Sequence, residues 1–257
     1  MKRIATIQDI SCFGKCSITV SLPVISAMGV ECAIVPTTVL STHTAGFTGY
    51  TVCDISDQLL PIAEHWKKEG ISLDTLYTGY LANETQINDT IKFIEMTKNE
   101  DTLVFVDPAM ADNGKLYPGF PSEFPSKMLE LVKTADVVCP NITEACLLLG
   151  KEFKNEGEYD EGYIKSLVDG FVALGIKKVV ITGVKTAATD GKYVIPETLD
   201  GKKVIAIMAL AFCDNNISNT VKTVFVPSTV KTIWNNAFAT CYNLTDIYFK
   251  GTSTVLI

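Results

Sequence analysis

The amino-acid sequence predicts a layered α/β domain with a parallel sheet over residues 1–184, and a different kind of segment over residues 185–257. Strand-like and helix-like runs alternate through the first part, as parallel strands joined by right-handed helical crossovers require. In the second part, a hydrophobic pattern recurs with the regularity of a repeat protein. The net charge also changes, from −9 in the first part (15 basic and 24 acidic residues) to +2 in the second (7 basic and 5 acidic).

Length and composition exclude several classes of protein. The 257 residues, of which 47% are hydrophobic and 20% charged, can bury a sizeable core. No apolar run approaches the ~20 residues that a membrane-spanning helix needs, and the N-terminus passes directly into a strand-like run instead of a signal peptide. The net charge of −7 argues against nucleic acid as a partner. We expect a cytoplasmic protein.

The cysteines point to free thiols in a reducing compartment. There are eight, at positions 12, 16, 32, 53, 139, 146, 213 and 241, and no two of them form a CxxC pair. With only His43 and His65 available as histidine ligands, a zinc site is not expected.

The strand-like runs are short and rich in β-branched or aromatic residues, as buried strands are. They cover residues 4–8, 32–36, 75–78, 102–106, 137–139 and 178–181. The fourth is the clearest example, because it stops at Asp107-Pro108, where the proline cannot continue a ladder of hydrogen bonds.

The helix-like runs have the length that crossovers between parallel strands need. They cover residues 17–28, 57–68, 83–98, 122–134, 143–149 and 159–174. The first stops at Gly29 and the second at Gly70, since glycine readily ends a helix. The fifth follows Pro140-Asn141, in which the asparagine is a plausible N-cap.

Polar or aromatic residues whose side chains can bind a ligand or take part in catalysis follow every predicted strand. In chain order they are Asp9, His43 and Thr44, Tyr80, Asp107 and Asp112, Asn141 and Glu144, and Thr182. Ligands of parallel α/β sheets lie just beyond the carboxyl ends of the strands. We therefore expect these residues to gather around a polar substrate or a metal–phosphate complex.

Structural roles are the alternative for several of them. Asp107 could simply close a strand, Asp112 could shape a turn, and Asn141 could cap a helix. A lone histidine is usually structural, but His43 stands among Ser, Thr and Gly residues at a strand end, which favours a function. Glu144 is within one helical turn of the strand end and could reach a metal.

Six motifs in one order carry a family resemblance. They are Ile7-Gln8-Asp9 with Gly14; Ser41-Thr42-His43-Thr44; Tyr77-Thr78-Gly79-Tyr80; Asp107-Pro108 with Asp112 and Gly114-Lys115-Leu116-Tyr117; Pro140-Asn141-Ile142-Thr143-Glu144; and Val179-Val180-Ile181-Thr182-Gly183. Together they resemble the pyridoxal kinases of the ribokinase-like superfamily over about residues 1–184.

The resemblance implies ATP-dependent phosphorylation of the hydroxymethyl group of pyridoxal, pyridoxamine or pyridoxine, and often a homodimer. It implies ATP and Mg²⁺ as cofactors and leaves open whether a monovalent cation is also needed. The implied substrate-binding residues are Asp9, His43, Thr44 and Tyr80; the nucleotide-binding residues are Asp112, Asn141 and Thr182; the metal ligands are Asp107 and Glu144.

One family motif is absent from the sequence. The resemblance leads us to expect, after the strand ending near Thr182, a Gly-Thr-Gly-Asp turn that holds the phosphate at a helix N-terminus and supplies the general base. After Val184 no such motif occurs, and the pairs Asp190-Gly191 and Asp200-Gly201 have the wrong order. We therefore name no catalytic residue and expect a ribokinase-like sheet that is incomplete at its C-terminal side.

Residues 190–257 resemble the leucine-rich repeats of bacterial surface proteins. The apolar pair Val221 and Val224 recurs with the same internal spacing as Leu244 and Ile247. An Ile-x-x-x-Ala-Phe element begins at position 207 and again at position 233. Recurrence at such intervals predicts a solenoid, and the resemblance implies a protein partner.

Three functional hypotheses remain open at this point. The chain could be a pyridoxal kinase, a B6-binding remnant fused to a leucine-rich-repeat interaction module, or a kinase of hydroxymethylpyrimidine type. Formation of a phosphorylated product from ATP would support a kinase. Binding of pyridoxal without turnover would support the remnant, and capture of a protein partner by residues 190–257 would support the interaction module.

Overall fold

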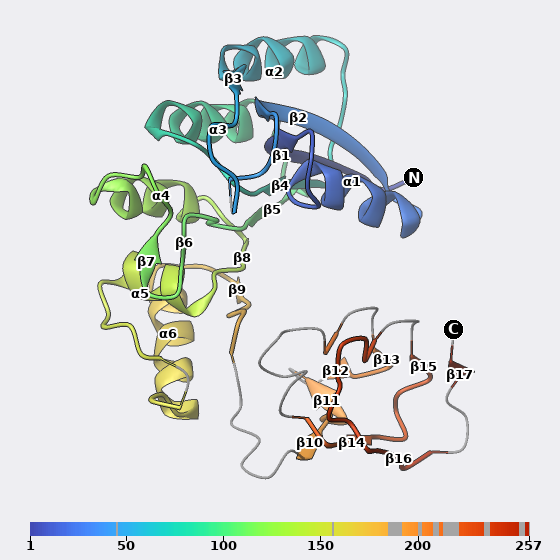
Figure 1. Ribbon diagram of the computed structural model, residues 1–257. Helices are drawn as coiled ribbons and strands as arrows, with labels where there is room; N and C mark the ends of the chain where they lie inside the picture. The colour runs from blue at the N-terminus through green and yellow to red at the C-terminus, as the bar shows by residue number, and fades with distance from the viewer. Residues whose placement is uncertain are drawn as a thin grey trace. The chain divides into compact units, whose positions relative to one another are not determined.

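The computed structural model describes residues 1–44, 46–155, 157–184, 192–199, 202–207, 211–212, 221–233, 237–251 and 255–256. The chain forms two compact units, Met1–Val184 and Lys185–Ile257 (Figure 1). Each unit has a hydrophobic core of its own. The pairs Asp190-Gly191 and Asp200-Gly201 and the thiol of Cys213 lie outside the described residues.

The first unit is built on a seven-stranded sheet. Its strands are β1 (Arg3–Ser11), β2 (Glu31–Leu40), β3 (Val52–Asp54), β4 (Thr75–Thr78), β5 (Leu103–Val106), β8 (Val137–Val138) and β9 (Lys178–Val179). They are arranged in the order β3-β2-β1-β4-β5-β8-β9. Every neighbouring pair is parallel except β2 and β3. The six predicted strands and their parallel pairing are confirmed.

The exception is the edge strand β3, which the sequence analysis did not predict. It consists of three exposed residues and pairs antiparallel with the end of β2, with Val39 opposite Cys53. A strand of this length has no readable alternation of apolar and polar residues. β2 is also longer than predicted, because it continues past Pro36 to Leu40.

The predicted helices are all present in the first unit. They are α1 (Ile18–Ala27), α2 (Leu59–Lys68) with a preceding 3-10 turn η1 (Ser56–Gln58), α3 (Glu84–Thr97), α4 (Phe124–Val132), α5 (Ile142–Leu149) and α6 (Glu161–Ala173). Side-chain oxygens cap several of their starts. For example, Asn83 accepts from the backbone N–H of Gln86 and Asp160 from that of Tyr163, which satisfies donors that the first turn leaves unpaired.

The main core of this unit lies between one face of the sheet and the helices that pack on it. Figure 1 shows α2 and α3 on this face and α1 on the other. Leu76 of β4, Val104 of β5 and Phe93 of α3 are completely buried there. On the opposite face, the neighbouring rings of Tyr77 and Phe105 are only half-buried, with their centroids 5.3 Å apart.

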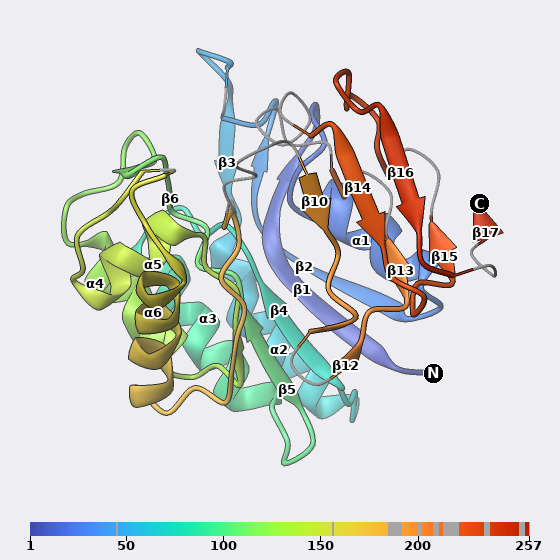
Figure 2. The same ribbon diagram turned by 90° about the horizontal axis from the view of Figure 1, so that it is seen from below.

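The second unit contains two parallel sheets and a short hairpin. One sheet has the order β10 (Lys192–Val194), β14 (Thr223–Val226), β16 (Asp246–Phe249); the other has the order β13 (Ala206–Ile207), β15 (Thr232–Ile233), β17 (Val255–Leu256); the hairpin is β11 (Thr198–Leu199) with β12 (Lys202–Lys203). Figure 2 shows β10, β14 and β16 side by side.

Strand pairing in this unit follows the recurrence of the sequence pattern. Val224 pairs with Ile247, its counterpart in the next repeat, and Ile207 pairs with Ile233, where the Ile-x-x-x-Ala-Phe element begins again. Each pass of the chain therefore lays one strand in each sheet. Val221 and Val224 of the repeat pattern lie in the hydrophobic core. The assignment to the leucine-rich-repeat class stays a prediction.

No described helix combines the length and the apolar character needed to cross a bilayer. In the first unit, the thiols of Cys12, Cys16, Cys32, Cys53, Cys139 and Cys146 are free.

The core of the first unit generates a stability prediction. Phe93→Ala removes a fully buried ring, so the free energy of unfolding should fall by about 3–5 kcal/mol. Urea denaturation followed by circular dichroism measures this. As a control, Val172→Ala in α6 removes a side chain that is 55% exposed and should change the value by less than about 0.5 kcal/mol. Equal effects of the two substitutions would contradict the packing described.

Candidate active site at the carboxyl ends of the strands

A cavity of about 460 Å³ lies where β1, β4 and β5 end, on the face of the sheet that α1 covers. The strand ends and the loops after them contribute Gln8, Tyr77, Gly79, Tyr80, Asp107 and Ala109. The loop before α1 and the helix itself contribute Lys15, Cys16, Ser17, Val20, Ser21, Val24 and Ile25. Its position is the one at which parallel α/β sheets bind ligands.

Gln8 is a buried amide in the wall of this cavity. Its side-chain carbonyl accepts a hydrogen bond from the hydroxyl of Ser21 at 3.3 Å, and its side chain also bonds to Tyr77. A Cβ atom at Gly79 would lie only 3.0 Å from the Gln8 side chain, so the glycine makes room for the amide. Gln8 belongs to the Ile7-Gln8-Asp9 motif but was not among the predicted site residues.

Asp107 presents a carboxylate whose surroundings disfavour its charge. The side chain is half-buried, and desolvation raises its pKa to about 6. Its backbone N–H donates to the carbonyl of Thr78, which continues the ladder between β5 and β4. Nearby, burial and the charge of Asp107 raise the pKa of Cys139 to about 11. Asp107 thus closes the strand and also lines the cavity.

Glu144 is a second carboxylate of the site, and unlike Asp107 it is fully buried. It is 3% exposed and accepts from the backbone N–H groups of Asn141 at 2.8 Å and Met110 at 3.2 Å. Burial above all, and then the charge of Asp107, raise the pKa of Glu144 to about 8 against the opposing effect of these hydrogen bonds. Asp107 and Glu144 therefore form a pair that a cation would stabilise.

Asn141 caps helix α5, as the sequence predicted. Its side-chain oxygen accepts from the N–H of Glu144 at 2.9 Å, and with the reciprocal bond from Glu144 it forms a capping box. Its amide group donates to the carbonyl of Ala111 at 2.8 Å. Both ends of the side chain are therefore engaged within the protein.

The start of α5 also holds the hairpin that carries Asp112. This hairpin consists of β6 (Ala111–Asp112) and β7 (Lys115–Leu116). The hydroxyl of the buried Thr143 accepts from the N–H of Gly114 at 3.0 Å. Asp112 itself is exposed and accepts from the backbone N–H of Asn113 at 2.8 Å. Its other carboxylate oxygen accepts from the side-chain amide of Asn113 at 3.1 Å, so Asp112 shapes the turn.

His43 and Thr44 lie at the end of β2. The N–H of His43 donates to the carbonyl of Phe13 at 3.0 Å, and the imidazole packs edge-on against Phe47. A Cβ atom at Gly14 would lie only 2.0 Å from an imidazole carbon, so Gly14 permits this close approach. Thr44 is exposed. Neither His43 nor Thr44 is among the residues that line the cavity.

Asp9 and Tyr80 interact electrostatically beside the cavity. The buried carboxylate of Asp9 accepts from the hydroxyl of Ser11 at 3.0 Å. Burial, followed by the charge of Asp9, raises the pKa of Tyr80 to about 12. The Tyr80 ring lies 5.7 Å from that of Phe120 and contributes to the cavity wall.

The sequence-predicted residues thus divide into three groups. Tyr80 and Asp107 line the cavity. Asp9 and Glu144 interact with these two through their charges. His43 and Thr44 follow β2, and Asp112 lies in the β6–β7 hairpin. Thr182 forms an isolated bridge to Asn141 just beyond the carboxyl end of β8. Among the described residues no three His, Cys, Asp or Glu side chains group together as a metal site. Asp107 and Glu144 therefore make a two-carboxylate arrangement.

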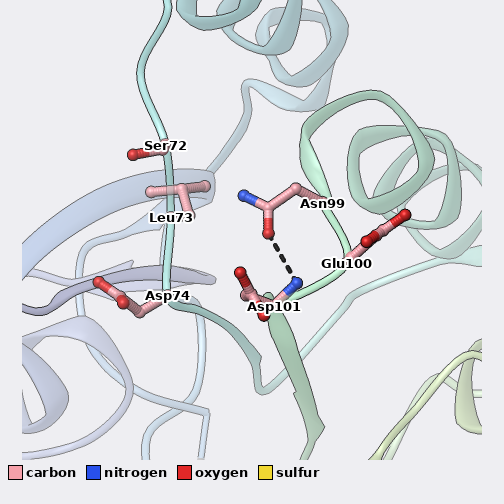
Figure 3. A pocket seen from close by; sticks show the side chains of 6 residues that line it. All are labelled: Ser72, Leu73, Asp74, Asn99, Glu100 and Asp101. Atoms are coloured by element: carbon pink, nitrogen blue, oxygen red, sulfur yellow. Dashed lines mark hydrogen bonds between the residues drawn. The ribbon is translucent and has the colours of Figure 1, made fainter.

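A second hollow of about 430 Å³ lies at the opposite, amino-terminal edge of the sheet (Figure 3). It is lined by Ser72, Leu73, Asp74, Asn99, Glu100 and Asp101. Two of its polar side chains have structural partners: Asp74 binds Lys2 and the N–H of Arg3, and Asn99 accepts from the N–H of Asp101. We therefore place the candidate site at the carboxyl edge.

Comparison with known proteins identifies relatives of this chain. A family model described as phosphomethylpyrimidine kinase matches residues 6–217, which extends past the boundary between the two units. A pyridoxal kinase of Dictyostelium discoideum is 33% identical over 112 residues, covering 41% of this chain and 33% of that protein. The chain thus aligns with about a third of that curated relative's length.

Solved structures support the same relationship. A Bacteroides thetaiotaomicron protein, solved in a form with pyridoxal, is 35% identical with a TM-score of 0.68, covering 73% of this chain and 64% of its own. Pyridoxal kinase from Lactobacillus plantarum is 31% identical with a TM-score of 0.65, covering 73% of this chain and 66% of its own.

The capping box generates a stability prediction. Asn141→Ala removes both the cap and the bond to Ala111, so the free energy of unfolding should fall by about 1–2 kcal/mol. Asn141→Ser keeps an oxygen that can cap the helix and loses the amide donor without adding charge beside Glu144, so its loss should be smaller. Urea denaturation measures both. A larger loss for Ser than for Ala would contradict the role of the capping oxygen.

The raised pKa of Asp107 predicts a pH dependence. The folded protein binds the proton more tightly than the unfolded chain, so stability falls as pH rises from about 4 to about 6. Asp107→Asn lacks this loss. By pH 7 the variant should exceed the wild type by on the order of 2 kcal/mol.

Denaturation curves from pH 4 to pH 7 measure this difference. Asp101→Asn, at an exposed aspartate, is the control and should follow the wild type. A difference between Asp107→Asn and wild type that stays constant across this range would show that Asp107 does not titrate as described.

Proposed function

Because the chain belongs to the phosphomethylpyrimidine kinase family, we propose that it is a kinase-type protein that binds B6 vitamers: pyridoxal, pyridoxamine and pyridoxine. The observation that carries this proposal is the cavity at the carboxyl ends of β1, β4 and β5, which joins an aromatic wall to the half-buried carboxylate of Asp107. The presence of pyridoxal in the Bacteroides relative supports the choice of ligand. A volume of about 460 Å³ suits a small molecule.

The substrate ring would lie beside Tyr80 and Gln8. Tyr80 supplies an aromatic surface on which a heteroaromatic ring can stack, and Phe120 supports it from the side. The Gln8 amide supplies a polar contact within the wall. In this proposal His43 and Thr44 belong to a loop near the ring, and Asp9 lies beside it in β1. Asp9 then acts through Tyr80, to which it is electrostatically coupled.

The phosphate side of the site would use Asp107 and Glu144. Magnesium is commonly bound through one or two carboxylates together with substrate phosphates. Burial holds the pKa of both carboxyl groups above its ordinary value, so their arrangement fits a cation that relieves the unfavourable charge. When bound, Mg²⁺ with ATP would neutralise the charge on the transferring phosphate. The exposed carboxylate of Asp112 and the backbone around Thr182 would face the nucleotide. Asn141 would act by holding the Ala111 loop.

Two other functional hypotheses have specific support. Binding of a B6 vitamer without phosphoryl transfer is favoured by the absence of a Gly-Thr-Gly-Asp motif from residues 185–257, because losing a general base costs about 10²–10⁴-fold in rate. A hydroxymethylpyrimidine substrate is favoured by the description of the matching family model.

We infer that the second unit is a leucine-rich-repeat-type interaction module and that the protein is cytoplasmic. Its support is the constant sequence offset between paired strands, from β14 to β16 and from β15 to β17, together with the inward apolar residues. Both are typical of solenoids. The free thiols of the first unit support a reducing compartment. A proteolytic fragment of residues 190–257 that folds and captures a protein partner would support the module.

The function is tested by ATP-dependent conversion of pyridoxal to its phosphate by the purified full chain with Mg²⁺. We expect product formation that Asp107→Ala lowers at least about 100-fold, because the variant loses a carboxylate from the phosphate side. Pyridoxine and hydroxymethylpyrimidine are compared as substrates under the same conditions.

The variant also separates the chain's activity from that of contaminating host kinase. Product that is equal for wild type and Asp107→Ala indicates contamination and contradicts the assignment of Asp107. If the folded chain makes no product but binds one pyridoxine per chain in calorimetry, the remnant reading holds. Preference for hydroxymethylpyrimidine would replace the B6 substrate.

A further inference from the structure

Strand β16 ends the three-stranded sheet β10-β14-β16 of the second unit. Thr223 to Val226 of β14 pair with Asp246 to Phe249 on one edge of β16. On the other edge, no strand pairs with β16 within the described part of the chain. An edge strand with unpaired N–H and C=O groups is a template for pairing with another chain.

Apolar residues of this last strand are less buried than their counterparts one repeat earlier. Val224 and Val226 are both completely buried, at 0% exposure. The residues paired with them, Ile247 and Phe249, are partly exposed, and Phe249 reaches 43%. The earlier strand has a neighbour on each side, whereas β16 has one among the described strands. Covering β16 with another strand would bury this apolar row.

The outward face of β16 carries opposite charges around an aromatic ring. Because side chains alternate along a strand, Ile247 and Phe249 share the inward face, and Asp246, Tyr248 and Lys250 share the outward face. Lys250 follows the last residue of β16 and still belongs to the ladder, since its N–H donates to the carbonyl of Val226. Its ammonium group lies 4.0 Å from a carboxylate oxygen of Glu197 in an exposed ion pair, which a stronger acidic partner across the edge would replace. Tyr248 is 53% exposed and stacks on Phe225 of β14 at 5.1 Å.

We propose that two copies of this chain associate by antiparallel pairing of their β16 edges, with the two-fold axis passing at Tyr248. In this register, Asp246 lies opposite Lys250 of the partner subunit, and Ile247 lies opposite Phe249 of the partner subunit. By symmetry each contact occurs twice. The strand is thus complementary to itself in charge and in hydrophobicity, as an isologous interface requires.

Other registers lose this complementarity. A two-fold axis between two residues would set inward side chains against outward ones. An axis at Ile247 would set Asp246 against Tyr248 of the partner subunit and would leave Lys250 without an acidic counterpart in the pairing. The axis at Tyr248 is therefore the register that satisfies both faces. This interface belongs to the second unit and does not depend on the kinase-type function proposed for the first.

Charge reversal at Asp246 and Lys250 tests the pairing directly. Sedimentation velocity of the full chain should show a dimer with a dissociation constant on the order of micromolar, since pairing of one edge buries less than a standard interface. Asp246→Lys or Lys250→Asp alone sets like charges against each other twice, and should weaken the dimer at least about tenfold.

Mixing the two single variants restores complementarity. In the mixed dimer, each introduced charge meets an opposite charge, so a heterodimer should form although each variant alone is weakened. The double variant Asp246→Lys/Lys250→Asp should also recover the wild-type dimer. Recovery in the mixture rules out misfolding of the single variants as the cause of their weakening. Lys231→Asp, at an exposed lysine next to β15, makes the same charge change elsewhere and should leave the dimer intact.

Three outcomes would overturn the proposal. These are a wild-type chain that stays monomeric up to about 100 µM, far above the expected constant; a dimer that neither reversal weakens; or single variants that fail to recover on mixing. A dimer formed elsewhere, such as through the first unit, gives the second outcome.

Discussion

The buried carboxylate of Glu144 is the interaction on which the geometry of the candidate site depends. It binds the N–H of Asn141 at the start of α5 and the N–H of Met110 in the loop after β5. One side chain thereby connects the segments that follow two strands. Asn141 and Thr143 add hydrogen bonds to Ala111 and Gly114 of the β6–β7 hairpin. The arrangement keeps a carboxyl group in a poorly solvated place, next to a second one, where ionisation is unfavourable. In the proposed function, a cation bound there would relieve this unfavourable charge.

The sheet explains why residues far apart in sequence meet here. Parallel strands all end at one edge, so β1, β4, β5 and β8 deliver Asp9, Tyr80, Asp107 and Asn141 to the same region. The sequence allowed this inference because strands and helices alternate clearly and because Pro108 and Asn141 mark boundaries. It did not reveal β3, whose three residues lack a pattern. Nor did it reveal Gln8 as part of the cavity wall, because the position of its side chain depends on Gly79 and Ser21, which come from other elements.

In the second unit, the repetition of apolar elements could be read from the sequence, but the different burial of equivalent residues could not. The repeated apolar elements predicted repeating passes of the chain, and the paired strands have the same sequence offsets as those elements. Val226 and Phe249 occupy equivalent positions, yet one is buried and the other is partly exposed. That difference arises from the number of neighbouring strands, which is a property of the fold.

Hydrogen–deuterium exchange of the full chain with and without pyridoxine tests most directly whether the cavity binds a B6 vitamer. Pyridoxine is preferred because pyridoxal carries an aldehyde that can react with lysines such as Lys15. We predict slower exchange in peptides containing residues 8–17, 77–80 and 107–110, and unchanged exchange in peptides from residues 192–251. Protection confined to residues 72–74 and 99–101, at the opposite edge of the sheet, or no protection at saturating pyridoxine, would contradict the assignment of the site.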